Sequence, residues 1–346
     1  MSARWMLTFT IRCEQLGVVV ALFSNTMLFY LLTFKANTSY GAYRRLMFSY
    51  TIVELMYSVI SVMSGMMAHS TETSFVVFDL YEGYVSRYLA PIFLIDFCAF
   101  YFTLILLLVV HFIYRYVVVC DFKKMEYFNG GYLMFWVFGS AACGVSMCIL
   151  KFFAFPETER RSIELSEEFS LYYNLTMDQV VYNGPNYYIC NENDECEMPL
   201  KDWTAMMILS NGLIFSIVIM LYCGYRCCVK LNKNDKQTSC RTVDLQKQLM
   251  IALIIQSVIP IIFMYIPILL LFITPMFKIG LGPYVNIAMA TLSIYPPIDQ
   301  FAIIYVIKDF RIGVKDFFKC GKKSDNTSSS TIFTTRLSLT KSHLSL

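Results

Sequence analysis

Apolar residues fill seven stretches of this chain, and charged residues are almost absent from each of them. An α-helix needs about 20 such residues to cross the hydrocarbon core of a bilayer. The stretches are too long and too continuously apolar for barrel strands, in which polar and apolar residues alternate. We therefore predict seven transmembrane helices, at about residues 15–34, 46–68, 88–114, 129–150, 203–225, 249–273 and 281–307.

The composition strengthens this prediction of an all-α membrane protein, a seven-transmembrane helix bundle. Hydrophobic residues make up 57% and charged residues 15% of the 346 residues, and the mean hydropathy is +0.55. Soluble domains carry about 25% charged residues. The first apolar stretch, 15–34, is longer than the hydrophobic region of a typical signal peptide, so we expect it to remain in the protein.

The distribution of basic residues predicts the orientation. Lys and Arg number 18 in the segments 35–45, 115–126, 226–247 and 308–323, and 8 in the segments facing the other way. Basic residues accumulate on the cytoplasmic side of membrane proteins. We therefore expect a plasma-membrane protein with residues 1–14 outside and the C-terminus inside. Arg4 and Arg12 run against this rule but are outnumbered.

Three segments lie outside the predicted bundle. The loop 151–202 holds eleven acidic residues and is too polar to be buried, so we place it over the extracellular mouth. Residues 308–320 form an amphipathic juxtamembrane helix, whose last residue, Cys320, is a candidate for palmitoylation. Residues 321–346 are rich in Ser and Thr and are expected to be a disordered cytoplasmic tail.

The sequence HFIYRY, residues 111–116, closes the third apolar stretch with an arginine between two tyrosines. Arg115 either reaches the lipid phosphates as a simple anchor or changes partners when the bundle opens. His111 lies one helical turn earlier on the same face. We take His111, Tyr114, Arg115 and Tyr116 as candidates for a signalling switch.

Three polar residues interrupt the first, second and seventh stretches, namely Asn25, Glu54 and Asp299. An ionisable group within the bilayer costs about 2.5–3.5 kcal/mol on insertion scales, so it usually faces a partner or water. These residues indicate one polar core, which is either a static link between helices or a group that rearranges.

Prolines interrupt the sixth and seventh stretches, at Pro260, Pro267, Pro296 and Pro297. A proline inside a helix removes a backbone hydrogen bond and favours a kink. We therefore consider all four as hinge candidates, although transporters and channels also contain such prolines.

These features together resemble a G-protein-coupled receptor. More specifically, the chain resembles the nematode seven-transmembrane chemoreceptors of the serpentine receptor class r (Str) family. The motifs that carry the resemblance are HFIYRY, FPETE, MLYCGY, LQKQLMIALIIQSVIPIIFMYIP, YPPID and KDFR, and they span most of the chain. The resemblance implies an odorant or pheromone-like ligand, a heterotrimeric G protein on the cytoplasmic face, and a location in the sensory cilium. The Ser/Thr-rich tail is either a site where a receptor kinase and arrestin act or simply a polar tail.

The chain also departs from the wider rhodopsin-type pattern. Tyr114, rather than a carboxylate, precedes Arg115, so the arginine could stack on tyrosine faces as a cation–π pair. No cysteine tops the third stretch, and Cys190 and Cys196 either pair with each other or stay free. The seventh stretch lacks a lysine, so a retinal cofactor is excluded.

The ligand is expected between the helices, in a mostly apolar cavity that opens outward. Phe97 lies 18 residues, or five turns, before Arg115 and therefore shares its face, and Tyr101 lies one turn further on. Asp96 is turned about 100° away and is either a ligand counter-ion or a packing residue. The other candidates for ligand contact are Asn211, Phe263 and Tyr265.

Other functions are weighed against the receptor. A non-olfactory receptor for a peptide or small transmitter is the nearest alternative. A transporter would show broken helices at matching positions in two halves, which the prolines do not. An enzyme is not expected, because the three histidines are dispersed and neither HExxH nor GxSxG occurs. We expect no metal and no cofactor. Of three N-x-S/T sequons, only Asn174 faces the outside on this topology, and it is a candidate for glycosylation.

Overall fold

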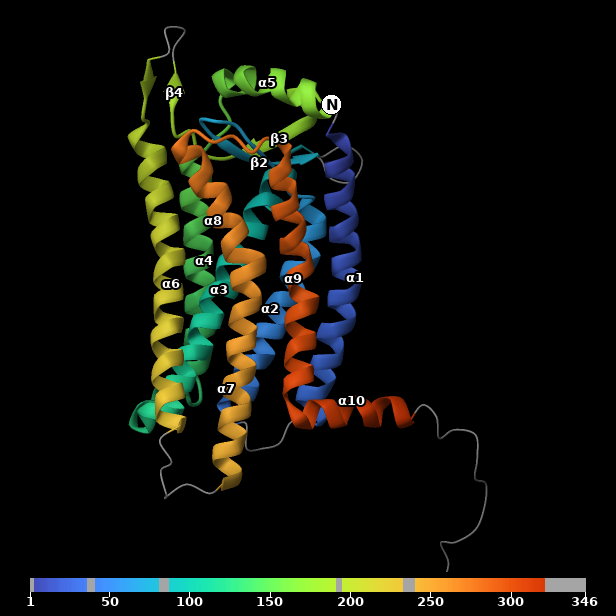
Figure 1. Cartoon of the computed structure of the whole chain (residues 1–346), viewed down its shortest axis with the longest axis vertical. Helices are drawn as coiled ribbons and strands as arrows, with labels where there is room; N and C mark the ends of the chain where they lie inside the picture. The colour runs from blue at the N-terminus through green and yellow to red at the C-terminus, as the bar shows by residue number, and fades with distance from the viewer. Residues whose placement is uncertain (1–2, 36–40, 81–86, 191–194, 233–239, 321–346) are drawn as a thin grey trace, which may run out of the picture.

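The computed structural model describes residues 3–35, 41–80, 87–190, 195–232 and 240–320, and side chains only to residue 318 and not at 240–245. Seven helical spans in this part of the chain are long and apolar enough to cross a membrane. They run side by side as one bundle (Figure 1). The spans are α1 (Arg4–Phe34), α2 (Ala42–Ser64), α3 (Ala90–Cys120), α4 (Tyr132–Ala154), α6 (Leu200–Asn232), the composite α7 (Cys240–Pro260), η4 (Ile261–Tyr265) and α8 (Ile266–Ile273), and α9 (Asn286–Val306).

The number of spans agrees with the prediction, but several ends differ. The first helix begins at Arg4, so most of the segment 1–14 is helical rather than a separate N-terminus. The second ends at Ser64, before Gly65 with its positive φ of 49°, and Met67 and Ala68 are in a strand. Hydropathy marks the part of a helix that crosses the lipid, whereas backbone hydrogen bonding continues into polar residues beyond it.

A cap covers one end of the bundle, and we call this the cap end (Figure 1). It contains an antiparallel sheet of β1 (Met67–Ser70), β2 (Phe75–Leu80) and β3 (Val180–Asn183), in that order. Helix α5 (Glu159–Tyr173) lies over the sheet. Here the predicted loop 151–202 and the second loop of the chain fold together, because β2 pairs with both β1 and β3.

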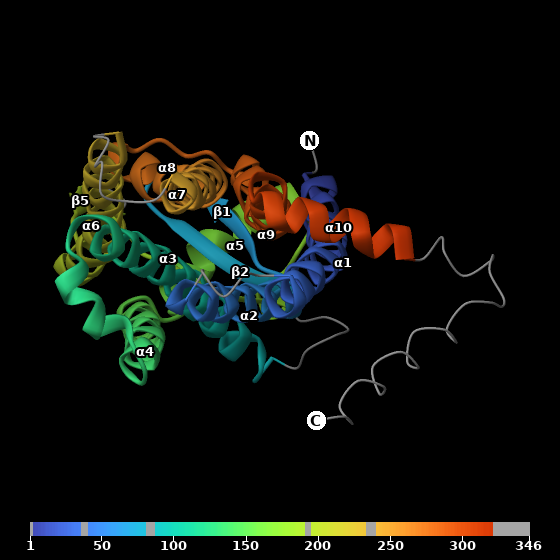
Figure 2. The ribbon, with the colours of Figure 1, turned by 90° about the horizontal axis from the view of Figure 1, so that it is seen from below.

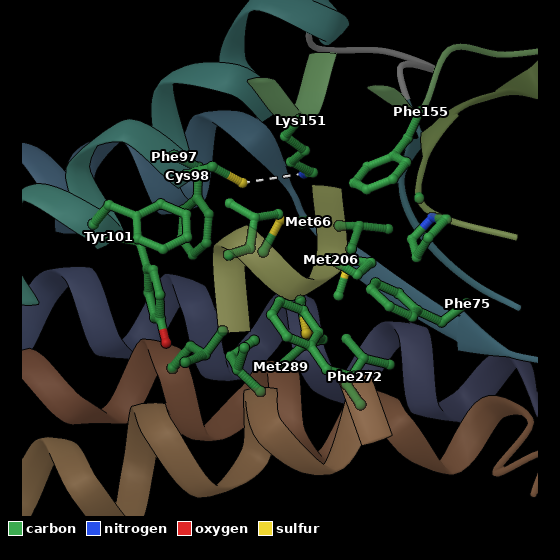
Figure 3. Close-up of a pocket in the computed structure, with 18 residues that line it drawn as sticks. Met66, Phe75, Phe97, Cys98, Tyr101, Lys151, Phe155, Met206, Phe272 and Met289 are labelled. Carbon is green, nitrogen blue, oxygen red and sulfur yellow. Dashed lines mark hydrogen bonds between the residues drawn. The ribbon is translucent and has the colours of Figure 1, made fainter. Parts of the chain in front are cut away.

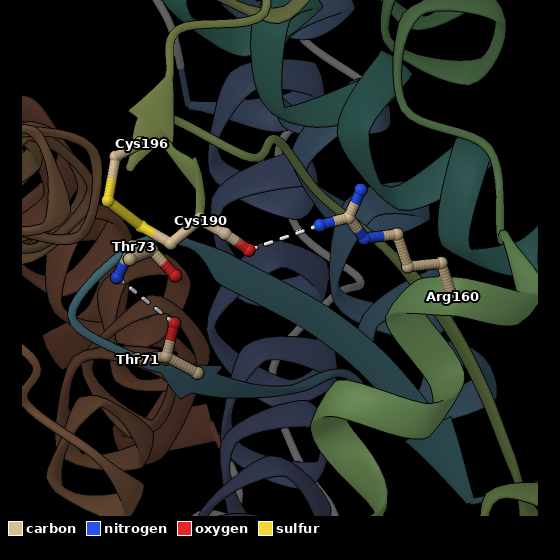
Figure 4. The surroundings of a disulfide bond; sticks show 5 residues. All are labelled: Thr71, Thr73, Arg160, Cys190 and Cys196. Carbon is tan, nitrogen blue, oxygen red and sulfur yellow. Dashed lines mark hydrogen bonds between the residues drawn. A yellow bond between two sulfur atoms is a disulfide. The ribbon is translucent and has the colours of Figure 1, made fainter. Parts of the chain in front are cut away.

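A two-stranded hairpin of β4 (Ile189–Cys190) and β5 (Cys196–Glu197) projects beside the cap, and Cys190 and Cys196 are joined by a disulfide (Figure 4). Of the two alternatives left open by the sequence, the structure has the paired one. The carbonyl of Cys190 accepts a 3.2 Å hydrogen bond from Arg160 of α5.

The opposite end carries α10 (Lys308–Cys320), which lies across the bundle axis (Figures 1 and 2). Phe310 is fully buried against the bundle, whereas Phe317 and Phe318 are exposed on the amphipathic helix. The side chain of Cys320, the sequon residues Asn37 and Asn326, and the tail 321–346 lie outside the described residues. Short helical segments complete the chain: η2 (Phe122–Phe128), η3 (Met177–Gln179), η5 (Thr274–Phe277) and η6 (Pro283–Val285).

The sixth span is the irregular one. Directly after Pro260 the backbone widens into the π turn η4, and Pro267 lies in the first turn of the next α-helical segment, which begins at Ile266. A proline that removes a backbone bond is a common cause of such an irregularity. Pro296 and Pro297, by contrast, lie inside the continuous helix α9.

Candidate functional sites: a capped cavity and a buried arginine

An apolar cavity of about 60 Å³ lies beneath the cap, between the helices (Figure 3). Its wall is built mainly from aromatic, aliphatic and methionine side chains. The lining residues include Phe97, Tyr101 and Phe102 of α3, Lys151 of α4, Met206 and Leu209 of α6, Ile268, Leu271 and Phe272 of α8, Met289 and Leu292 of α9, and Phe75 and Val77 of β2. A water molecule needs roughly 10–15 Å³ in such a cavity, so the space suits a small compound and not a peptide.

The roof of the cavity is held by Arg161 of α5, which is 3% exposed. Its guanidinium donates hydrogen bonds to the carbonyl oxygens of Phe75 (2.8 Å), Pro185 (3.0 Å) and Gly184. These three acceptors belong to residues that line the cavity. One arginine therefore joins β2 and the segment Gly184–Pro185 to each other and to α5, and we call these two segments the roof.

Two of the predicted ligand contacts, Phe97 and Tyr101, do line the cavity. Both are buried, as is Arg115 five turns along, so the three share the inward face that their spacing predicts. The hydroxyl of Tyr101 donates a 3.4 Å hydrogen bond to the carbonyl of Met264 in the π turn. Asp96 is half-buried beside this face and is not a lining residue.

Three other candidates lie elsewhere. Asn211 is exposed on the outer side of α6 and donates to the carbonyl of Met207 in its own helix. The hydroxyl of Tyr265 is 2.7 Å from that of Ser216, deeper in the bundle. Phe263 is half-buried, and its carbonyl accepts a 3.0 Å hydrogen bond from Thr291. None of the three lines the cavity.

Below the cavity, the predicted polar residues Asn25, Glu54 and Asp299 are all completely or almost completely buried. Gln256 and Gln300 are buried as well and were missed, because an amide in an apolar stretch is a weak sequence signal. Glu54 has no hydrogen-bond partner among the described residues, Asp299 interacts with the side chain of Gln256 without a hydrogen bond of good geometry, and the two carboxylates interact electrostatically with each other. Nearby, the hydroxyls of Tyr50 and Tyr295 hydrogen-bond α2 to α9. This is a poor match to a static link, in which buried polar atoms would be paired.

Near the end of the bundle that carries α10, Arg115 is 2% exposed and does not reach outward as a lipid anchor. Its guanidinium carbon lies 3.7 Å from the ring centroid of Tyr43 and 5.8 Å from that of Tyr114, which is the predicted stacking on tyrosine. Its Nη1 donates a 2.9 Å hydrogen bond to Oε1 of Gln246 on α7. Nε and Nη2 have no partner among the described residues.

The other switch candidates surround this arginine. The rings of Tyr43 and Tyr114 stack with centroids 5.7 Å apart. His111 is buried, its Nδ1 donates a 2.7 Å hydrogen bond to the carbonyl of Leu107, and its ring packs edge-on against Tyr43 and Tyr50. Tyr116 faces α6 instead, with its ring centroid 6.0 Å from that of Tyr222.

Asn174, the predicted glycosylation site, is exposed at the end of α5 in the cap, with a φ of 56°. This placement leaves its side chain accessible.

The fold defines the class of protein. Squid rhodopsin superposes with a TM-score of 0.60 over 94% of this chain and 88% of its own, at 11% sequence identity, so the fold is that of a seven-helix G-protein-coupled receptor.

Residues 10–315 match the model of the serpentine type 7TM GPCR chemoreceptor Str family, and the chain belongs to this family. It is 29% identical over 325 residues to serpentine receptor class r-10 of Caenorhabditis elegans, covering 94% of this chain and 95% of the relative. It is 28% identical over 309 residues to G-protein coupled receptor str-33 of the same species, covering 88% and 89%. The protein is therefore a multi-pass membrane protein of a chemoreceptor family, and its relatives are receptors rather than enzymes.

Proposed function

We propose that this protein is an olfactory-type receptor that binds a small odorant or pheromone-like compound in the capped cavity and activates a heterotrimeric G protein. The observation that carries the proposal is the Arg115–Gln246 contact, which closes α3 against α7 at the end of the bundle opposite the cavity. A receptor needs a ligand site and a distant element with two arrangements that the ligand can bias.

The sixth span connects these two places. Ile268, Leu271 and Phe272 of α8 line the cavity, and Gln246 of α7 holds Arg115. Between them lies the π turn after Pro260, whose Met264 carbonyl accepts a hydrogen bond from Tyr101 of the cavity wall. A ligand that favours a different position of α8 would move α7 about this turn and separate Gln246 from Arg115.

The arginine is suited to a change of partners because its planar fork makes discrete contacts. Two of its donor nitrogens, Nε and Nη2, have no hydrogen-bond partner in the described chain and are therefore available to new acceptors. In our proposal the released guanidinium contacts the G protein.

The proposed setting follows the orientation of the basic residues. We place the cap end outside the plasma membrane and α10 on the inner leaflet, with the sensory cilium as the site of action. Arrestin and a receptor kinase are proposed partners of the Ser/Thr-rich tail.

The proposal is tested by Arg115→Lys, which keeps the positive charge and loses both the fork and the stacking on Tyr43. We expect the variant to reach the cell surface and lose most ligand-dependent signalling. Arg226→Lys is the matched control, because Arg226 is an exposed arginine of the neighbouring helix α6. Normal signalling by Arg115→Lys at equal surface density would show that this arginine is only an anchor.

A further inference from the structure

The cavity carries a single charged side chain among its lining residues, the ammonium of Lys151. Lys151 lies in the last turn of α4 and reaches toward Cys98 of α3 at the edge of the cavity (Figure 3). Every other lining side chain is apolar, apart from the Tyr101 hydroxyl and the Cys98 thiol.

The half-buried ammonium has one hydrogen-bond partner in the described chain, the sulfur of Cys98. Its Nζ donates a 3.2 Å hydrogen bond to Sγ of Cys98, and it forms no ion pair with a described carboxylate. Sulfur is a poor hydrogen-bond acceptor. A cation in apolar surroundings is stabilised much more by an anion that accepts a charge-assisted hydrogen bond.

A second observation concerns access. Lys151 also lines an outer cavity of about 260 Å³ at the cap end, together with Arg87. The acidic residue of that outer cavity, Glu157, has its Oε1 engaged by the backbone N–H of Tyr182 at 2.8 Å. Lys151 therefore lies between the outer and the inner cavity, and its ammonium group lines both of them.

We infer that the ligand of the capped cavity is a small apolar carboxylate, whose carboxylate group pairs with Lys151 while its hydrocarbon part contacts Phe97, Met206 and Phe272. This inference rests on the proposed function for the site itself and adds the chemical class. It also assigns Lys151 as the residue that selects the ligand.

A structural role for Lys151 makes a different prediction. A cation in the last turn of a helix interacts favourably with the helix dipole, and that interaction is indifferent to the ligand. Removing it would lower the stability of the protein and leave the preference among ligands unchanged.

The experiment uses the full-length receptor, purified in lipid nanodiscs, and a series of carboxylates from acetate to octanoate together with benzoate and phenylacetate. Each is compared with a neutral partner of the same size, for example pentanoate with its isomer methyl butanoate and with pentanol. Ligand-induced shifts in Tm report binding without signalling, and calcium responses in expressing cells report activation. The variants are Lys151→Met and Lys151→Arg, with Lys201→Met as a control on an exposed lysine of the same end.

We expect at least one carboxylate to raise Tm where its ester and alcohol do not. Lys151→Met should weaken that carboxylate by roughly tenfold or more, as expected for a hydrogen bond between charged groups, and Lys151→Arg should retain most of the binding. The Tm without ligand shows whether each variant is folded.

The outcomes separate the two proposals. If carboxylates bind through Lys151 and no signal follows, the ligand class stands and the signalling function is wrong. If esters or alcohols bind or activate as well as carboxylates and Lys151→Met responds normally, the receptor function stands and the ligand class is wrong. The ligand class is also wrong if no carboxylate of the series changes Tm.

Discussion

Arg115 of α3 and Gln246 of α7 are joined by a 2.9 Å hydrogen bond, and the guanidinium is at the same time stacked on the ring of Tyr43 from α2. Three helices thus meet at one buried cation. The polar contact between α7 and α3 is made by an amide that carries no charge, in addition to the apolar packing of Leu249 and Ala252.

Replacing that amide should release the link. We expect Gln246→Leu to raise ligand-independent signalling, because a hydrogen bond to a charged group contributes about 1.5–3 kcal/mol and its loss shifts the equilibrium toward the open state by roughly tenfold. G-protein activation measured without ligand, at matched surface density, checks this. Gln248→Leu, the same change two residues further along and on another face of α7, should leave basal activity near wild type. Equal basal activity in all three proteins would argue against the link.

The cavity wall should determine potency. We expect Phe97→Ala and Tyr101→Ala to shift the agonist dose–response curve by roughly tenfold or more while surface expression persists, because each removes an aromatic ring from the small cavity. Phe97→Leu is a milder variant that tests the same contact with less risk to folding. Phe100→Ala, on the same helix and not in the lining, is the control. Unchanged curves for both cavity variants would place the ligand elsewhere.

The roof should depend on Arg161. Arg161→Met leaves three carbonyl oxygens without this donor, and unpaired buried acceptors cost about 1–3 kcal/mol each. We expect a fall in Tm of several degrees and weakened ligand binding. The adjacent Arg160→Met removes only an exposed pair with Glu164 and an exposed bond to Cys190, so its Tm should be almost unchanged. A similar small effect from both variants would contradict the role of Arg161 in the roof.

A pH dependence should originate in the cap. Burial raises the pKa of Asp79, in β2, from its ordinary value of 3.8 to about 7. Between these values the folded protein holds a proton that the unfolded chain has lost, so stability falls as the pH rises toward 7 and then levels off. The buried Glu14 of α1 lies near enough to interact with this carboxyl group.

We therefore expect Asp79→Asn to abolish part of the decrease in Tm between about pH 5 and pH 7.5. The control is Asp178→Asn, because the pKa of this exposed carboxyl lies below its ordinary value and it stays ionised throughout that range. A wild-type Tm that does not decrease over this range, or one that decreases equally in Asp79→Asn, would rule out this assignment.

The orientation is open to a direct test. An epitope tag at the N-terminus should be stained on intact cells, and one at the C-terminus only after permeabilisation, because the 18-to-8 distribution of Lys and Arg predicts that α10 lies inside. A C-terminal tag visible on intact cells would invert the topology and end the receptor proposal.

Helical spacing from Arg115 alone predicted which other residues of α3 face the interior of the bundle. Phe97 and Tyr101 were placed from their distance to Arg115, and a regular helix keeps that relation over five turns. The same method did not place Asn211, because a polar residue in an apolar stretch indicates no direction until neighbouring helices are known. On the outer surface of the helix, the side-chain amide of Asn211 donates its hydrogen bond to the Met207 carbonyl and needs no partner inside the bundle.

The roof could not be predicted from the sequence. Arg161, Gly184 and Phe75 meet only because loops that are distant in the chain pair through β2 and β3. Lys151 was counted among the basic residues of the long loop, and its direction into the cavity depends on how α4 ends against α3. Tyr43, likewise, reaches Arg115 from the start of another helix.

The π turn at Ile261–Tyr265 has a consequence for how the sequence of this receptor can change in evolution. A π turn holds one residue more than an α turn, and π turns of this kind are often located at functional sites. Deleting a single residue there would convert it to a regular turn, and because the wider turn had taken up the extra residue, the side chains of α8 would keep their direction toward the cavity. What would be lost is the widened turn itself, whose Met264 carbonyl accepts the hydrogen bond from Tyr101 of the cavity wall. The loss of one codon would thus alter the connection between the cavity and α7 and leave the lining residues unchanged.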